Sequence, residues 1–219
     1  RPELRERSDA TLKSEFKKLG SVLKKNKTYV LILITQAFFT ISVMIVPHLL
    51  NMFEAELQVS SSDVNTFLNF QSFGIMLGGL IPVLCGKKLG NAFLVLFYSV
   101  SGLICGVFSV VCVAAHLASF WMLAVISVTG GITTCSWVAF YNVIIDVSEE
   151  NEVTVFMQGN SILTLVLSLA TVVGGMIITY AGYMAVFTSA LACAVIGTAF
   201  SVYVMYSMRK RNGEKQNNE

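Results

Sequence analysis

Six long apolar stretches constrain the fold of this chain more than any other feature of its sequence. They cover residues 29–53, 64–85, 91–114, 120–145, 155–180 and 183–208. A helix needs about 20 mostly apolar residues to cross a lipid bilayer, and each stretch meets that length. None of them alternates between apolar and polar residues, so a membrane β-barrel is not indicated. We therefore predict an all-α membrane protein with six transmembrane helices.

The scarcity of charge agrees with this prediction. Charged residues make up 13% of the chain, against about 25% in a typical soluble domain. The five cysteines lie singly in apolar stretches without a CxxC pair, a pattern that favours neither a metal site nor a disulfide framework. We expect no metal and no other cofactor.

The positive charges predict how the helices are oriented. All 15 Lys and Arg lie in three places: before Thr28, at Lys87 and Lys88, and after Met208. Short loops rich in Lys and Arg stay on the cytoplasmic side of a membrane. With six spans, these three places share one side, so both termini are predicted to be cytoplasmic.

Two polar segments flank the predicted bundle at residues 29–208. Residues 1–28 are predicted to be a cytoplasmic linker with an amphipathic helix, because Leu12, Phe16, Leu19 and Leu23 recur at helical spacing. A solvated tether is the alternative. Residues 209–219 are predicted to be a short, disordered cytoplasmic tail, since they are almost entirely polar.

Polar and aromatic side chains follow one face of the first, second, fourth and fifth spans. Such a face must look at protein or water rather than lipid, so these spans are expected to surround a cavity while the third and sixth face lipid. The alternative is that the polar groups bond to each other between helices. We predict a substrate-binding site formed by Gln36, Phe39, Asn69, Trp137, Tyr141 and Asn160.

No ionisable residue lies at the middle of any span. A proton or ion path within these helices is therefore not predicted. Intramembrane catalysis would need a nucleophile with a base, or paired acids, at membrane depth, so we do not expect an enzyme. A unit of an ATP-driven exporter is disfavoured because the predicted inner loops are short and no P-loop is present.

Two further features predict local geometry. Pro47 is expected to bend the first span near its outer end, since proline cannot donate a backbone hydrogen bond. Gly74 and Gly78, spaced four apart, are expected to let two helices approach closely.

The order of these features resembles the C-terminal half of a major facilitator superfamily transporter. The stretch IPVLCGKKLGNAF resembles the loop motif of that family, with Lys88 and Gly90 at its basic and glycine positions. Lys87 stands where the family usually has Asp. The stretch VVGGMIITYAGY is similar to the glycine-rich eleventh helix, and the opening RPE is similar to the segment after the sixth helix.

This resemblance implies secondary active transport of a small organic solute, a drug or a metabolite, by alternating access. The partners it implies are that solute, membrane lipid and an N-terminal six-helix half upstream in the same polypeptide. Nucleic acid is not expected. The implied location is the plasma membrane or a bacterial inner membrane. The alternatives are half of a cation-coupled sugar symporter, and a non-transporting sensor or scaffold of transporter ancestry.

The acidic inner loop at residues 146–152 suggests a gate. Our hypothesis is that Asp146, Glu149, Glu150 or Glu152 pairs with basic residues when the cytoplasmic side closes, the basic partners being Lys87, Lys88 or the N-terminal helix. Exposed pairs are weak but can bias two nearly balanced states. A solvated acidic loop is the alternative. The predicted gate residues are Lys87, Lys88, Asp146, Glu149 and Glu152.

Overall fold

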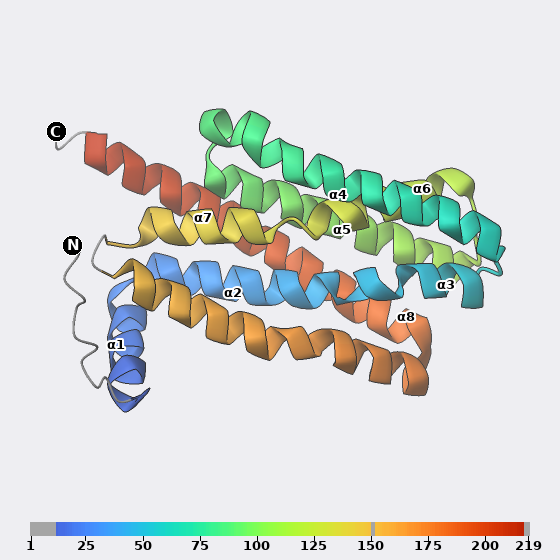
Figure 1. Ribbon diagram of the computed structural model, residues 1–219, viewed down its shortest axis with the longest axis horizontal. Coiled ribbons are helices and arrows are strands. Elements are labelled where there is room, and N and C mark those ends of the chain that lie inside the picture. Colours follow the sequence, from blue (N-terminus) through green and yellow to red (C-terminus); the bar gives the residue numbers. More distant parts are fainter. Residues whose placement is uncertain (1–11, 150–151, 217–219) are drawn as a thin grey trace, which may run out of the picture.

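The computed structural model describes residues 12–149 and 152–216, and every regular element among them is helical (Figure 1). The all-α class predicted from the sequence is confirmed for these residues. The elements are α1 (Leu12–Lys25), α2 (Lys27–Ser42), the 3-10 helix η1 (Val43–His48), α3 (Leu49–Ala55), α4 (Ser61–Leu89), α5 (Asn91–Ala115), α6 (Phe120–Thr133), α7 (Trp137–Val147) and α8 (Val153–Gln216).

Five stretches of the described chain are helical, long and apolar enough to cross a membrane. Their length and composition are those of an integral membrane protein. They are Lys27–Ala55, Ser61–Gly86, Asn91–Ala115, Phe120–Val147 and Val153–Arg211.

The longest of these stretches, in α8, consists of two helical arms. They meet at Gly182, whose φ of 78° and ψ of 172° are not helical. A positive φ suits glycine because it lacks a Cβ. Figure 1 shows the chain reversing direction here, so that the second arm returns toward the end where the first began. The two arms correspond to the predicted stretches 155–180 and 183–208.

The first predicted span is not one continuous α-helix. After α2, the chain tightens into η1 over Val43–His48 and then resumes as α3. Pro47 lies inside η1. Because proline has no N–H to donate, the α-helical ladder is interrupted here, at the position where the sequence predicts a bend.

The fourth predicted span, residues 120–145, is also interrupted, and the sequence analysis did not anticipate this. Residues 134–136 form a turn between α6 and α7. The hydroxyl of Thr133 donates to the carbonyl of Gly130 at 2.6 Å, and that of Thr134 donates to Gly131 at 2.7 Å. Threonine hydroxyls that bond nearby carbonyls compete with the helical ladder, and two glycines before them weaken the helix further.

Glycines bring the backbones of α4 and α6 into close contact. A Cβ on Gly74 would collide with the backbone carbonyl of Val128, and one on Gly131 with the carbonyl of Gln71. The two backbones therefore touch directly, as the spacing of Gly74 and Gly78 predicts. Elsewhere α2 packs against α8, and α5 packs against both α6 and α8.

The N-terminal helix α1 packs against α8. Val22 is buried, and Leu19 lies beside Gly159 of α8. The side chain of Asn26 caps α2 by accepting a hydrogen bond from the N–H of Tyr29 at 3.0 Å. Residues 1–11 of the predicted linker, including the RPE segment, lie outside the described residues.

The predicted tail, residues 209–219, is not disordered throughout. Helix α8 continues through its first part to Gln216, because Arg209, Lys210 and Arg211, which follow the last span, are residues of good helix propensity. Residues 217–219 lie outside the described part of the chain.

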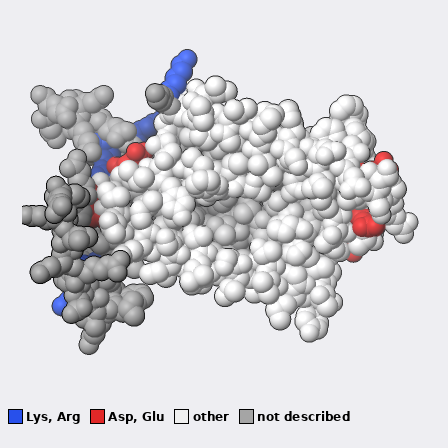
Figure 2. Space-filling model, viewed as in Figure 1, with Lys and Arg blue, Asp and Glu red and all other residues white. Residues whose placement is uncertain are grey.

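Charge is confined to the two ends of the described structure. Figure 2 shows Lys and Arg at one end, acidic groups at both ends and an uncharged middle. The basic end comprises α1, the last residues of α4 and the end of α8, whereas Glu54, Glu56 and Asp63 lie at the opposite end (Figure 1). An uncharged band between two polar ends is the pattern that a bilayer imposes.

Candidate functional site

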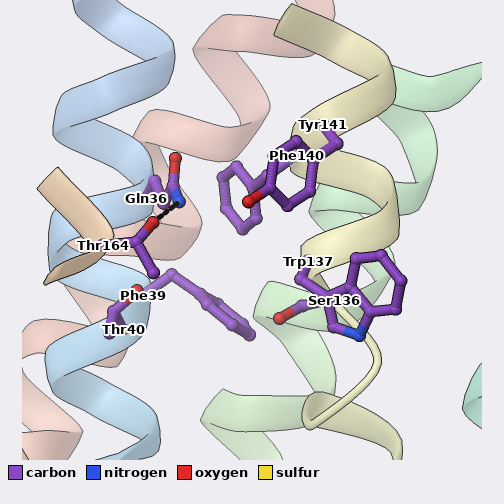
Figure 3. A pocket seen from close by; sticks show the side chains of 8 residues that line it. All are labelled: Gln36, Phe39, Thr40, Ser136, Trp137, Phe140, Tyr141 and Thr164. Atoms are coloured by element: carbon purple, nitrogen blue, oxygen red, sulfur yellow. Dashed lines mark hydrogen bonds between the residues drawn. The ribbon is translucent and has the colours of Figure 1, made fainter. Parts of the chain in front are cut away.

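A cavity of about 550 Å³ opens within the uncharged middle of the bundle (Figure 3). Residues of α2 form one wall, α7 and the turn before it form the opposite wall, and the first arm of α8 contributes one hydroxyl. We call it the central cavity. Its lining consists of Gln36, Phe39, Thr40, Ser136, Trp137, Phe140, Tyr141 and Thr164.

Four of the six predicted binding residues line this cavity: Gln36, Phe39, Trp137 and Tyr141. They come from two helices separated by about a hundred residues of sequence, and Figure 3 shows these helices on opposite sides of the cavity. The polar and aromatic helix faces predicted from the sequence therefore contribute to one cavity.

The other two predicted residues lie elsewhere. Asn69 is exposed on α4 and does not line the central cavity. Asn160 lies on α8 one turn from Thr164, but its side chain is fully buried rather than exposed to the cavity. The binding role of Asn69 and Asn160 stays a prediction.

The amide of Gln36 is held by a short chain of hydrogen bonds. Its Nε2 donates to the hydroxyl oxygen of Thr164 at 3.3 Å, and that hydroxyl donates to the backbone carbonyl of Asn160 at 2.9 Å. A threonine hydroxyl has one hydrogen. Because that hydrogen is already donated to Asn160, the oxygen can only accept from Gln36, which fixes the orientation of the Gln36 amide.

Three buried polar atoms of Gln36 and Asn160 lack hydrogen-bond partners in the described part of the chain. Oε1 of Gln36 is buried and has no hydrogen-bond partner among the described residues, and the same holds for Oδ1 and Nδ2 of Asn160. A buried polar atom without a partner costs about 1–3 kcal/mol. The seam between α2 and α8 therefore holds unused hydrogen-bonding capacity beside the cavity.

Four of the eight residues that line the cavity are aromatic. The rings of Trp137 and Tyr141 meet edge to face with centroids 6.0 Å apart, and those of Phe39 and Phe140 are tilted with centroids 5.5 Å apart. The side chain of Trp137 is 60% exposed, whereas Phe140 is buried. Rings arranged in this way offer both faces and edges to a flat ligand.

Sequence reasoning missed Ser136 and Phe140 as lining residues. Ser136 lies four residues before Phe140, the spacing of one helical face, and off the spacing of Trp137 and Tyr141 from which the site was predicted. Phe140 also packs in the core against Phe39, and nothing in its apolar neighbourhood distinguishes it in the sequence. Thr40 and Thr164 lie on the polar faces that the sequence predicts for the first and fifth spans.

The predicted gate region lies at the basic end of the molecule. Nζ of Lys25, at the end of α1, lies 3.2 Å from a carboxylate oxygen of Glu149 in the acidic loop. This hydrogen bond and the charges of Glu149 and Glu152 raise the pKa of Lys25 above its usual value. The acidic loop thus contacts the basic N-terminal helix, one of the partners in the gate hypothesis.

Asp146 has a different partner. Its carboxylate accepts a hydrogen bond at 2.8 Å from Nδ2 of Asn91, the first residue of α5. Lys88 is exposed near the end of α4, and Lys87 precedes it on the same helix. Glu152 lines a smaller cavity together with Lys25. Glu150 lies outside the described residues, and the gating role of all these groups stays a prediction.

The central cavity offers hydrogen-bonding and aromatic groups to a ligand. Its lining holds one amide, three hydroxyls of Ser and Thr, three other aromatic side chains and the phenol of Tyr141. In the described part of the chain, no group of three or more His, Cys, Asp and Glu side chains is placed to hold a metal ion.

No protein-family model, curated protein or solved structure matches this chain. The function must therefore be argued from the cavity, the charge pattern and the helices themselves.

Proposed function

We propose that this chain is the C-terminal, six-span half of a major facilitator superfamily transporter, which moves a small organic solute across a membrane by alternating access. The observation that carries the proposal is the central cavity. It lies in the uncharged middle of the bundle and is lined by amide, hydroxyl and aromatic groups from three helical segments. Substrate sites of secondary transporters lie near the bilayer midplane and use discontinuous helices.

The interrupted helices support the same proposal. The turn at residues 134–136 leads directly into the cavity wall formed by Ser136 and Trp137. Irregular backbone at membrane depth is tolerated where it lines a cavity or is buried in protein. A break placed at the cavity is therefore in keeping with a transport site.

The proposed topology has six spans with both termini in the cytoplasm. The two arms of α8 count as separate spans, and α2 with η1 and α3 counts as one, as does α6 with α7. The basic residues of α1, α4 and α8 then share one side, and loops rich in Lys and Arg remain cytoplasmic. The acidic end with Glu54, Glu56 and Asp63 faces outward in this arrangement.

The remaining side of the central cavity, which the described helices leave open, is assigned to an N-terminal six-helix half of the same polypeptide. Helix α4 and the first arm of α8 present exposed apolar residues along their length, among them Val83, Leu84, Leu165 and Val172. In a membrane these faces contact lipid or other helices. Alternating access requires a second half against which this one can rock.

Transport by the reconstituted native polypeptide tests the proposal. Liposomes carrying the protein are given a mixture of sugars, nucleosides, aromatic amines and uncharged heteroaromatic compounds, and the trapped solutes are identified by mass spectrometry. We expect at least one solute to accumulate. Gln36→Leu should reduce its flux, whereas Asn51→Leu should not, since Asn51 is an exposed amide on α3 outside the cavity.

Equal contents in protein-containing and protein-free liposomes would contradict transport. That result would favour a membrane sensor or scaffold, because such a protein binds a ligand without moving it. Equal flux in the Gln36→Leu and Asn51→Leu variants would leave transport standing but remove the central cavity as its site.

A further inference from the structure

The lining of the central cavity carries no formal charge. None of its eight residues is Asp, Glu, Lys, Arg or His. An unpaired charge in a site of low dielectric constant is strongly disfavoured. The part of any solute that contacts these eight residues is therefore best uncharged.

The same lining offers more ring surface than hydrogen-bonding groups. Trp137, Tyr141, Phe39 and Phe140 contribute four aromatic rings. A sugar presents a hydroxyl on nearly every carbon, and each needs a partner once it leaves water. A flat ring with one or two polar groups matches this balance better, because its faces pack on aromatic side chains.

One polar atom beside the cavity lacks a donor. Gln36 is 7% exposed, and its Oε1 has no hydrogen-bond partner among the described residues. Its Nε2 bond to Thr164 is long, at 3.3 Å. Turning the side chain into the cavity would break that single long bond, and a ligand N–H or O–H would give Oε1 the donor it lacks.

We infer that this cavity selects an uncharged aromatic or heteroaromatic solute that donates a hydrogen bond to Oε1 of Gln36 while its ring packs against Trp137 and Tyr141. This inference rests on the proposed function, since it names the class of solute that the transporter would carry. The donor on the solute sets the selectivity, and the aromatic walls provide most of the contact area.

Matched pairs of probes test the donor. Theophylline has a ring N–H that caffeine replaces with N–CH₃, and indole is related to 1-methylindole in the same way. Dissociation constants for these four compounds are measured on the native polypeptide in lipid nanodiscs by ligand-observed NMR. Methyl glucoside serves as the sugar probe and benzoate as the charged one.

We expect the donor of each pair to bind roughly three- to tenfold tighter than its methylated analogue, the size of one net hydrogen bond. In Gln36→Met, which keeps the side-chain length and removes the amide, the ratio should fall to about one. Asn51→Leu should keep the ratio of the native protein, because Asn51 is exposed on α3 and does not line the cavity. The thermal midpoint of each variant shows whether it is folded, and Gln36→Leu provides a second apolar replacement.

Three results would overturn the inference: equal binding within both pairs, a donor preference that survives in Gln36→Met and Gln36→Leu, or tighter binding of methyl glucoside or benzoate. Failure of all four aromatic probes to bind would also overturn it. This assay measures binding and not flux. A preference for the hydrogen-bond donors, found together with no solute transport in liposomes, would therefore refute the proposed function alone. Flux without a donor preference refutes the inference alone.

Discussion

The hydroxyl of Tyr29 donates a hydrogen bond to the backbone carbonyl of Phe156 at 2.6 Å, joining α2 to the first arm of α8. The two rings also pack against each other with centroids 4.3 Å apart. Tyr29 is fully buried. This contact holds α2 against the first arm of α8 and so fixes the seam between them. The hydrogen bond of Gln36 to Thr164 and the central cavity lie farther along the same two helices.

Removing the Tyr29 hydroxyl should weaken this seam. We expect Tyr29→Phe to lower the free energy of unfolding by about 1 kcal/mol, the net value of one hydrogen bond, while the ring contact persists. Thermal or denaturant unfolding in detergent measures the change. Tyr203→Phe is the control, since Tyr203 is exposed, and it should differ from the native protein by less than about 0.5 kcal/mol. Equal effects of the two substitutions would contradict the assigned bond.

Adjacent glycines on α4 should respond oppositely to alanine. A Cβ on Gly78 would lie 2.8 Å from the carbonyl oxygen of Ile132, whereas one on Gly79 would meet nothing within 4 Å. Gly78→Ala should therefore lower the free energy of unfolding by roughly 1–3 kcal/mol. Gly79→Ala should raise it by up to about 1 kcal/mol, because alanine favours the helix. Similar unfolding midpoints for the two variants would show that α4 and α6 are not in backbone contact.

Asn160 should be a residue whose replacement stabilises the protein. Its side chain is fully buried and neither polar atom has a partner in the described part of the chain. Asn160→Leu replaces the amide with an apolar group of the same branched shape, and we expect the free energy of unfolding to rise by about 1–3 kcal/mol. Unfolding in detergent measures this. A loss of stability would mean that Asn160 has hydrogen bonds of its own in the native membrane.

The ion pair between Lys25 and Glu149 predicts the titration of the lysine. The hydrogen bond to Glu149 raises the pKa of Lys25 above its ordinary 10.5. A raised pKa means that the pair stabilises the fold fully below the ordinary value and is lost as the pH rises through the higher one. NMR of ¹³C-labelled lysine should show Lys25 titrating above its ordinary 10.5. Glu149→Gln should lower the pKa of Lys25, and an unchanged value would rule out the pair.

Much of the fold follows from apolar length and from glycine and proline. The stretch 91–114 predicts α5 within one residue of its end, and the turn between residues 180 and 183 is found at Gly182. The turn at residues 134–136 was not predictable from apolar length, because the sequence stays apolar across it. The signal that was present is Gly130-Gly131 followed by two threonines, whose hydroxyls bond back to the helix.

The candidate site was predictable only in part, because helical spacing groups residues of one helix but not of different helices. Helical spacing brought Gln36 and Phe39 together, and likewise Trp137 and Tyr141, because each pair lies on one helix. Spacing alone cannot say which helices meet across a cavity. Asn69 shares the polar character of these residues, yet α4 packs against α6 and leaves Asn69 exposed away from the central cavity. That outcome depends on tertiary packing.

Access to Tyr141 tests the central claim most directly. Tyr141→Cys is made in a background without the five native cysteines, and membranes carrying the native polypeptide are treated from either side with a membrane-impermeant maleimide. Ala139→Cys is the control, because Ala139 is fully buried and should stay unmodified. If the cavity takes part in alternating access, Tyr141→Cys will be modified from both sides, and a transported solute will change the ratio of the two rates. Modification from neither side, or a ratio that no solute changes, would contradict the account.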